Sequence, residues 1–97
     1  MIYSLSLRPR ALAELAAARE RYEIVGHGEA FLDEVDSVFE AIQAMPLRFP
    51  IAYGTVHRAL LRRYPFTVFF RIRRDSENVV ILAVFPQRSD PARWPKR

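Results

Sequence analysis

Three β-rich runs joined by very short connections constrain the fold of this chain more than any other feature. They span Val56–Tyr64, Phe66–Arg74 and Val79–Phe85. Valine, isoleucine, phenylalanine and tyrosine dominate them, and these residues suit a pleated, half-buried surface. A parallel pairing would need a long crossover, so connections this short allow only antiparallel neighbours. The sequence therefore predicts a three-stranded meander.

A strand and two helices are predicted before the meander. Ile2–Leu7 alternates in the manner of a strand with one wetter face, and Pro9 suits the first turn of a helix. Helix formers fill Arg10–Glu23, and Glu29–Met45 carries an apolar stripe opposite an acidic face. The glycines of loop 26–28 separate the two helices, which predicts an antiparallel hairpin.

These elements define the predicted fold class. It is α+β: a helical hairpin packed on a small antiparallel β-sheet, in the order β-α-α-β-β-β. With 97 residues, the chain is expected to form a single domain over residues 1–97. The pairing of the first strand stays open, because it could join either edge of the sheet or insert between strands.

Composition excludes several classes of protein. The chain has no cysteine, which rules out disulfides, thiolate metal sites and thiol nucleophiles. No apolar run approaches the roughly 20 residues that cross a bilayer, and the opening residues lead directly into a strand rather than a signal peptide. No glycine-rich phosphate loop, serine triad or metal cluster is present in the sequence. We therefore expect a cytoplasmic protein without a cofactor or a metal.

Charge is distributed unevenly along the chain. Residues 1–45 hold four basic and eight acidic residues, whereas residues 46–97 hold eleven basic and three acidic ones. This asymmetry implies one positive face, and such a face suits a partner of acidic or phosphate character. Arginine supplies fourteen of the fifteen basic residues. Its planar fork pairs well with carboxylate and phosphate, although a GC-rich genome would also favour arginine codons.

The predicted strands place the arginines by alternation. Arg58 and Arg62 are expected to share one face of the first run, and Arg71 and Arg73 to share one face of the second. The side chains near them that could transfer a proton are His57, Tyr53 and Tyr64. A histidine alternating with arginines on a strand is more often structural, so no catalytic residue is predicted.

Four stretches in order resemble the RelE/ParE superfamily of type II toxin–antitoxin toxins. The first runs from Phe31-Leu32-Asp33-Glu34-Val35 to Ile42, and the second is Arg58-Ala59-Leu60-Leu61-Arg62-Arg63-Tyr64-Pro65-Phe66. The third is Phe69-Phe70-Arg71, and the last joins Ala83-Val84-Phe85 to Arg88-Ser89-Asp90-Pro91-Ala92-Arg93-Trp94. The fold that this resemblance implies agrees with the independent prediction above.

The resemblance implies one of two activities. RelE-like members are ribosome-dependent mRNA endoribonucleases, whereas ParE-like members inhibit DNA gyrase by binding it. Pro86-Gln87 stands where many relatives have a histidine before Arg88, and no tyrosine, histidine or glutamate follows the last strand. This departure favours a ParE-like gyrase inhibitor over a nuclease. A non-toxic binding module of the same fold is the remaining alternative.

The resemblance also implies partners. A cognate antitoxin is expected, with an acidic or amphipathic C-terminal segment lying across the helical hairpin and the sheet. We assign its contact to Leu12, Leu15 and Tyr22. The target, DNA gyrase or the ribosome, is expected to contact basic residues of the sheet and the C-terminal tail. These are Arg58, Arg62, Arg63, Arg71, Arg73, Arg88, Arg93, Lys96 and Arg97.

Overall fold

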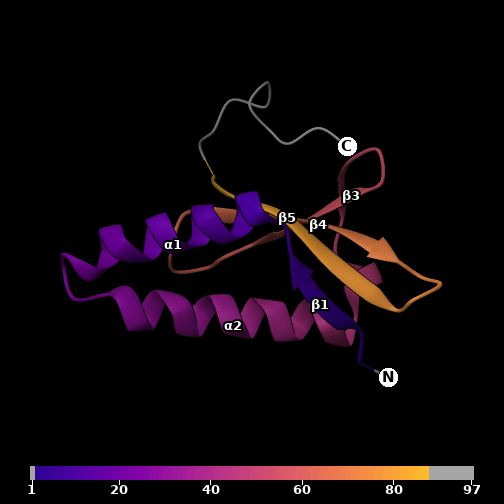
Figure 1. Cartoon of the computed structure of the whole chain (residues 1–97), viewed down its shortest axis with the longest axis horizontal. Helices are drawn as coiled ribbons and strands as arrows, with labels where there is room; N and C mark the ends of the chain where they lie inside the picture. The colour runs from indigo at the N-terminus through magenta and orange to yellow at the C-terminus, as the bar shows by residue number, and fades with distance from the viewer. Residues whose placement is uncertain (1, 88–97) are drawn as a thin grey trace.

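A five-stranded sheet with two helices on one face makes up the protein, whose computed structural model describes residues 2–87 (Figure 1). The helices lie side by side and cover the same side of the sheet. In chain order the elements are β1 (Ser4–Leu7), α1 (Pro9–Glu23), α2 (Gly28–Ala44), the short 3₁₀ helix η1 (Pro46–Arg48), β2 (Ile51–Tyr53), β3 (Val56–Leu60), β4 (Phe66–Arg73) and β5 (Asn78–Pro86).

The predicted fold class is confirmed, and the structure settles the place of the first strand. The strand order is β1-β5-β4-β3-β2, in which β3, β4 and β5 form the predicted antiparallel meander. β1 lies at one edge and runs parallel to β5, with Ser4 opposite Asn78 and Leu7 opposite Ile81. The helical hairpin lies within the long connection that a parallel pairing requires. The sheet as a whole is therefore mixed.

The other edge strand, β2, was not predicted. It has only three residues and pairs with β3 through an irregular register, Ile51 opposite His57 and Tyr53 opposite Val56. Gly54 has a φ of 52°, in the left-handed region, at the turn between the two strands. Glycine reaches that region at little cost, which permits the tight reversal. So short a strand carries too little alternation to be recognised in a sequence.

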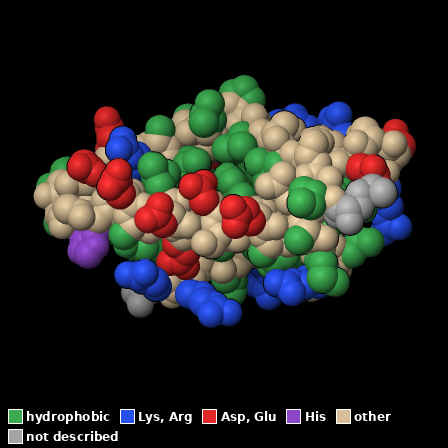
Figure 2. Space-filling view, turned by 90° about the horizontal axis from the view of Figure 1, so that it is seen from below, with side chains coloured by type: hydrophobic (Ala, Val, Ile, Leu, Met, Phe, Trp, Pro, Cys, Tyr) green, Lys and Arg blue, Asp and Glu red, His purple; other side chains and the backbone are tan. Residues whose placement is uncertain are grey.

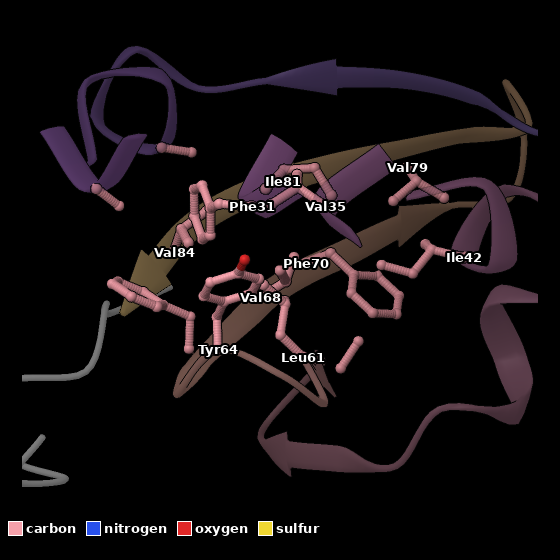
Figure 3. Close-up of a cluster of buried hydrophobic side chains, with 14 residues drawn as sticks. Phe31, Val35, Ile42, Leu61, Tyr64, Val68, Phe70, Val79, Ile81 and Val84 are labelled. Carbon is pink, nitrogen blue, oxygen red and sulfur yellow. The ribbon is translucent and has the colours of Figure 1, made fainter. Parts of the chain in front are cut away.

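The main core lies between the sheet and the helices. Side chains from α2 meet those of β3, β4 and β5 in this layer (Figure 3). Phe31 is fully buried, and its ring centroid lies 5.4 Å from that of Tyr64 and 5.6 Å from that of Phe66, both in edge-on geometry. Tyr22 of α1 completes this aromatic cluster, 5.1 Å from Phe31. Aromatic pairs prefer such tilted and edge-on arrangements.

An irregularity in the β4–β5 pairing changes which side chains of β5 face the helices. Phe69 pairs with Ala83 and Phe70 with Ile81, so Leu82 is the extra residue. Val79, Ile81 and Val84 belong to the main core, whereas Val80, Leu82 and Ala83 form a second cluster with Val56 and Phe69. A bulge of this kind shifts the alternation by one residue. The second cluster lies on the sheet face turned away from the helices, hereafter the outer face.

Glu14 of α1 fixes β5 just past this bulge, where β1 has ended. The Val84 N–H donates to Glu14 Oε1 at 2.8 Å, and Arg10 Nε donates to Glu14 Oε2 at 3.1 Å. Val84 is 1% exposed, so its N–H would otherwise be buried without an acceptor. The carboxylate therefore takes the place of a neighbouring strand.

Replacing Glu14 by alanine is expected to lower the free energy of unfolding by about 1–3 kcal/mol, the usual cost of an unsatisfied buried donor. Glu14→Gln keeps an acceptor oxygen and should lose less than half of that. Arg10→Ala removes the partly exposed ion pair and the contact of the guanidinium with the Phe85 ring, 4.6 Å away, and should cost less than E14A. Urea denaturation of the three variants measures the loss in free energy of unfolding for each and so tests this order. Equal losses for E14A and R10A would show that the contacts of Arg10, and not the Val84 hydrogen bond, stabilise this region.

Candidate functional site

The described arginines of the predicted basic face separate into two groups. Arg58, Arg71 and Arg73 lie on the outer face: Arg58 is opposite Phe69, Arg71 opposite Val80, and Arg73 two residues further along β4. The alternation predicted for β4 is confirmed. Arg58 and Arg73 are exposed, whereas Arg71 is half-buried and its Nε has no hydrogen-bond partner within residues 2–87.

The second group, Arg62 and Arg63, lies in the loop between β3 and β4. The expectation that Arg58 and Arg62 share one face of a strand is wrong, because β3 ends at Leu60 and not at Tyr64. Tyr64 instead turns into the aromatic cluster, with a 7% exposed side chain. The stabilisation from burying this ring exceeds the stabilisation that two or three further residues of strand pairing would give. Alternation therefore does not apply to residues 61–65.

Glu34 of α2 holds this loop from the side. The backbone N–H of Arg62 donates to Glu34 Oε2, and the N–H of Arg63 lies 3.0 Å from Oε2 and 3.2 Å from Oε1. One carboxylate thus satisfies two neighbouring backbone donors in charge-assisted hydrogen bonds, which are stronger than neutral ones. Arg62 and Arg63 are themselves exposed. Glu34 acts here on the backbone and forms no ion pair with these arginines.

A groove of about 570 Å³ runs between α2 and this loop. Figure 2 shows acidic side chains in a row over the middle of this side of the molecule and basic ones along its lower edge. Asp33 and Glu34 line the groove on the α2 side, and Arg48, Arg62 and Arg63 line it on the other. Its apolar lining comes from Ala30, Val38, Ala41, Phe49 and Leu60. The Arg48 guanidinium lies 5.4 Å from the Phe49 ring centroid.

Within residues 2–87, Arg10–Glu14 is the one side-chain ion pair. The arginines of the outer face and of the groove therefore have no carboxylate of the described chain in ion-pair range. An exposed cation without an internal counter-ion remains available to an anionic partner. The exposed arginines of both groups meet this requirement.

The proton-transfer candidates on the sheet lie in the interior. His57 is 9% exposed, its Nδ1 lies 2.8 Å from the Phe49 carbonyl oxygen, and its ring stacks on Phe70 at 5.3 Å. The Nδ1–H donates to that carbonyl, so His57 fastens the segment before β2 to the core. Tyr64 is in the aromatic cluster, and the hydroxyl oxygen of Tyr53 is buried. His57 Nδ1 and the Tyr53 hydroxyl oxygen are therefore not presented on the surface beside the arginines, and Tyr64 is 7% exposed.

The residues predicted for antitoxin contact differ in their surroundings. Leu12 of α1 is 58% exposed. Leu15 is partly buried against the core, and Tyr22 belongs to the aromatic cluster and lines a shallow depression of about 380 Å³ with Val25 and Phe66. The structure thus places one of them openly on the surface and packs the other two inward.

The remaining predicted target-binding residues lie outside the described residues. They are Arg88, Arg93, Lys96 and Arg97. Sequence reasoning missed three groove residues, namely Glu34, Arg48 and Phe49. Glu34 looked like its acidic neighbours on α2, because nothing in the order of residues shows which carboxylate meets a loop 28 positions away. Arg48 lies outside the β-rich stretch on which the predicted basic face was built.

The fold is that of small toxins from toxin–antitoxin systems. It matches the "Chromosomal ParDE TA system from P. aeruginosa" with a TM-score of 0.71 and 22% identity, covering 88% of this chain and 96% of that one. The isolated RelE toxin of E. coli gives a TM-score of 0.69 at 13% identity, with 93% and 89% covered. The RelBE2 toxin–antitoxin complex of Mycobacterium tuberculosis gives 0.59 at 21% identity, with 89% and 99% covered.

Sequence comparison narrows this class to one family. The family model described as "ParE toxin of type II toxin-antitoxin system, parDE" matches residues 5–91. The chain therefore belongs to the ParE toxin family of type II toxin–antitoxin systems. No curated protein matches it in sequence. Within residues 2–87, no helix is both long and apolar enough to cross a membrane.

Proposed function

We propose that the chain is a toxin that inhibits DNA gyrase by binding it, without making or breaking a covalent bond. The observation that carries this proposal is the interior position of the proton-transfer candidates beside an exposed set of arginines. His57 uses Nδ1 to hold the Phe49 carbonyl, and Tyr64 packs against Phe31. A general acid or base must come within hydrogen-bond reach of its substrate, and these groups face the core instead.

The exposed arginines supply the means of binding. Arg58 and Arg73 on the outer face, and Arg62 and Arg63 beside α2, are exposed and without a described carboxylate partner. Cations of this kind raise the rate of encounter with an anionic surface and set the orientation of docking. We include Arg71, Arg88, Arg93, Lys96 and Arg97 in the proposed target contact. The cytoplasm, where gyrase acts, is the proposed location.

We further infer a cognate antitoxin as partner. The P. aeruginosa and M. tuberculosis structures are a ParDE system and a RelBE2 toxin–antitoxin complex, respectively. Leu12 of α1 exposes 58% of its surface, and Ile24 and Val25 at the end of α1 expose 84% and 65%. An amphipathic antitoxin segment passing along α1 would cover this apolar surface, with Leu15 and Tyr22 at its inner margin.

Purified protein added to DNA gyrase tests the proposed function. We expect inhibition of supercoiling at micromolar or lower protein, and induced expression without antitoxin should arrest growth with DNA damage. Transcripts in those cells should remain intact, since an mRNA endoribonuclease would cleave them. Unimpeded supercoiling together with cleaved transcripts would assign the chain to the RelE-like activity. Normal growth with neither effect would leave a non-toxic binding module.

A further inference from the structure

The groove between α2 and the β3–β4 loop has the anatomy of a protein-docking surface. Its floor is apolar, with Leu60 53% exposed and the Phe49 ring beside it. Arginines form one rim. Specific protein interfaces combine an apolar centre enriched in aromatic residues and arginine with a polar rim. The outer-face arginines, in contrast, lie along β3 and β4, and none of them lines this groove.

Glu34 gives the basic rim a fixed shape. The Arg62 and Arg63 side chains are long and exposed, but the two N–H groups beneath them are held by the Glu34 carboxylate. Holding the backbone reduces the conformational freedom that must be lost when the two guanidinium groups engage a partner. Preorganisation of this kind raises affinity without adding a contact. α2, which carries Glu34, also forms the opposite wall of the groove. Glu34 therefore sets both the distance between α2 and the loop and the position of Arg62 and Arg63.

From this geometry we propose that the groove is the gyrase-docking surface and that Glu34 is a positioning residue acting through Arg62 and Arg63. The occupant is an acidic segment of gyrase with an apolar side chain for the floor at Leu60 and Phe49. Its carboxylates complement Arg48, Arg62 and Arg63, which outnumber the acidic groups that line the groove, Asp33 and Glu34. This inference rests on the proposed function and narrows it to one of the two arginine groups.

The test measures the concentration of toxin that halves gyrase supercoiling for a set of variants. R62A/R63A removes both guanidinium groups but keeps both backbone N–H groups, so the loop stays attached to Glu34. We expect this variant to require roughly 10–100 times more protein, the range for loss of central interface residues. R58A/R73A, the matched pair on the outer face, should raise the required concentration by less than R62A/R63A does, because charges outside the centre of an interface contribute less. R19A/R21A, which removes two exposed arginines of α1 outside the proposed target contact, should stay within about threefold of the unaltered protein.

A double-mutant cycle tests the role of Glu34. E34A should weaken inhibition by roughly five- to tenfold, and E34Q, which keeps one acceptor oxygen, should recover part of the loss. E34A/R62A/R63A should inhibit gyrase no less than R62A/R63A does, because Glu34 acts only by positioning the two arginine side chains that R62A/R63A has already removed. Additive losses would mean that Glu34 acts on folding or on gyrase directly. Asp36→Asn on the exposed side of the same helix is the control, expected to leave inhibition unchanged.

Amide hydrogen exchange gives a readout that needs no gyrase. In E34A the amides of Arg62 and Arg63 should exchange faster, while those of β4 keep their protection. Unaltered toxin that fails to inhibit gyrase would refute the proposed function itself. Active toxin whose inhibition survives R62A/R63A would refute only the groove assignment. If the groove variants R62A/R63A and E34A inhibit gyrase fully but no longer bind the antitoxin, the groove is the antitoxin-binding site and the proposal is wrong.

Discussion

Replacing Phe31 by alanine is expected to lower the free energy of unfolding by about 3–5 kcal/mol, the range for a buried aromatic side chain. Phe31 has no exposed surface, and its ring contacts Tyr22, Tyr64 and Phe66, which come from α1, the β3–β4 loop and β4. The alanine would leave a cavity where three elements meet. For a domain of this size, the loss should lower the melting temperature by at least roughly 12 °C.

Phe39 on the same helix provides the matched control. It packs against the core but is only partly buried, so F39A should cost clearly less than F31A. Thermal and urea denaturation of both variants measure the difference. Equal losses would show that the cluster around Phe31 is no more tightly packed than the edge of the core. That result would contradict the account of Tyr64 leaving the strand in order to reach this ring.

Replacing His57 by leucine is expected to cost about 1–3 kcal/mol of stability, because the Phe49 carbonyl loses its buried donor. Leucine keeps most of the apolar packing against Phe70, so the change isolates the hydrogen bond from the volume. The toxicity of each folded molecule should be unaltered, since His57 does not reach the surface. Stability is measured by urea denaturation, and toxicity by growth after induction at matched levels of soluble protein.

His27→Leu is the control for this change. His27 lies in the exposed loop between the helices, and its side chain makes no cap hydrogen bond, so its replacement should stay within about 0.5 kcal/mol. Loss of toxicity in H57L with stability retained would contradict a structural role for His57. A histidine that is needed for activity but not for stability takes part in the reaction itself. The outcome thus separates a structural role from a catalytic one at a single position.

Most of the architecture follows from local patterns. The alternation of Phe66 to Arg73 predicts its two faces correctly, because β4 lies between two partners and its register is fixed on both sides. The helices follow from their apolar stripes and from the break at Gly26, whose φ of 79° is one that residues with a Cβ rarely adopt. Such features are properties of neighbouring residues, which is why sequence shows them.

The site depends on contacts between distant residues and was only partly predictable. The sequence pattern predicts that the strand beginning at Val56 continues through Arg62, but the hydrogen bonds of Glu34 to the loop and the burial of Tyr64 end the strand at Leu60. One expected basic face therefore became two groups on different sides of the molecule. The composition of the second half still pointed to a cationic surface, because charge is a sum that does not depend on where each strand ends.

The parallel pairing of β1 with β5 has a consequence for the order of folding. Ser4 lies opposite Asn78, so β1 gains its strand neighbour only after the 74 residues that follow Ser4 have been made. The helices can form earlier, yet α1 receives its contact with Val84 only when β5 has emerged. Non-local pairings of this kind slow folding, since a long loop must close first. The sheet of such a toxin stays incomplete until β5 has been made, which gives an antitoxin already present time to meet it.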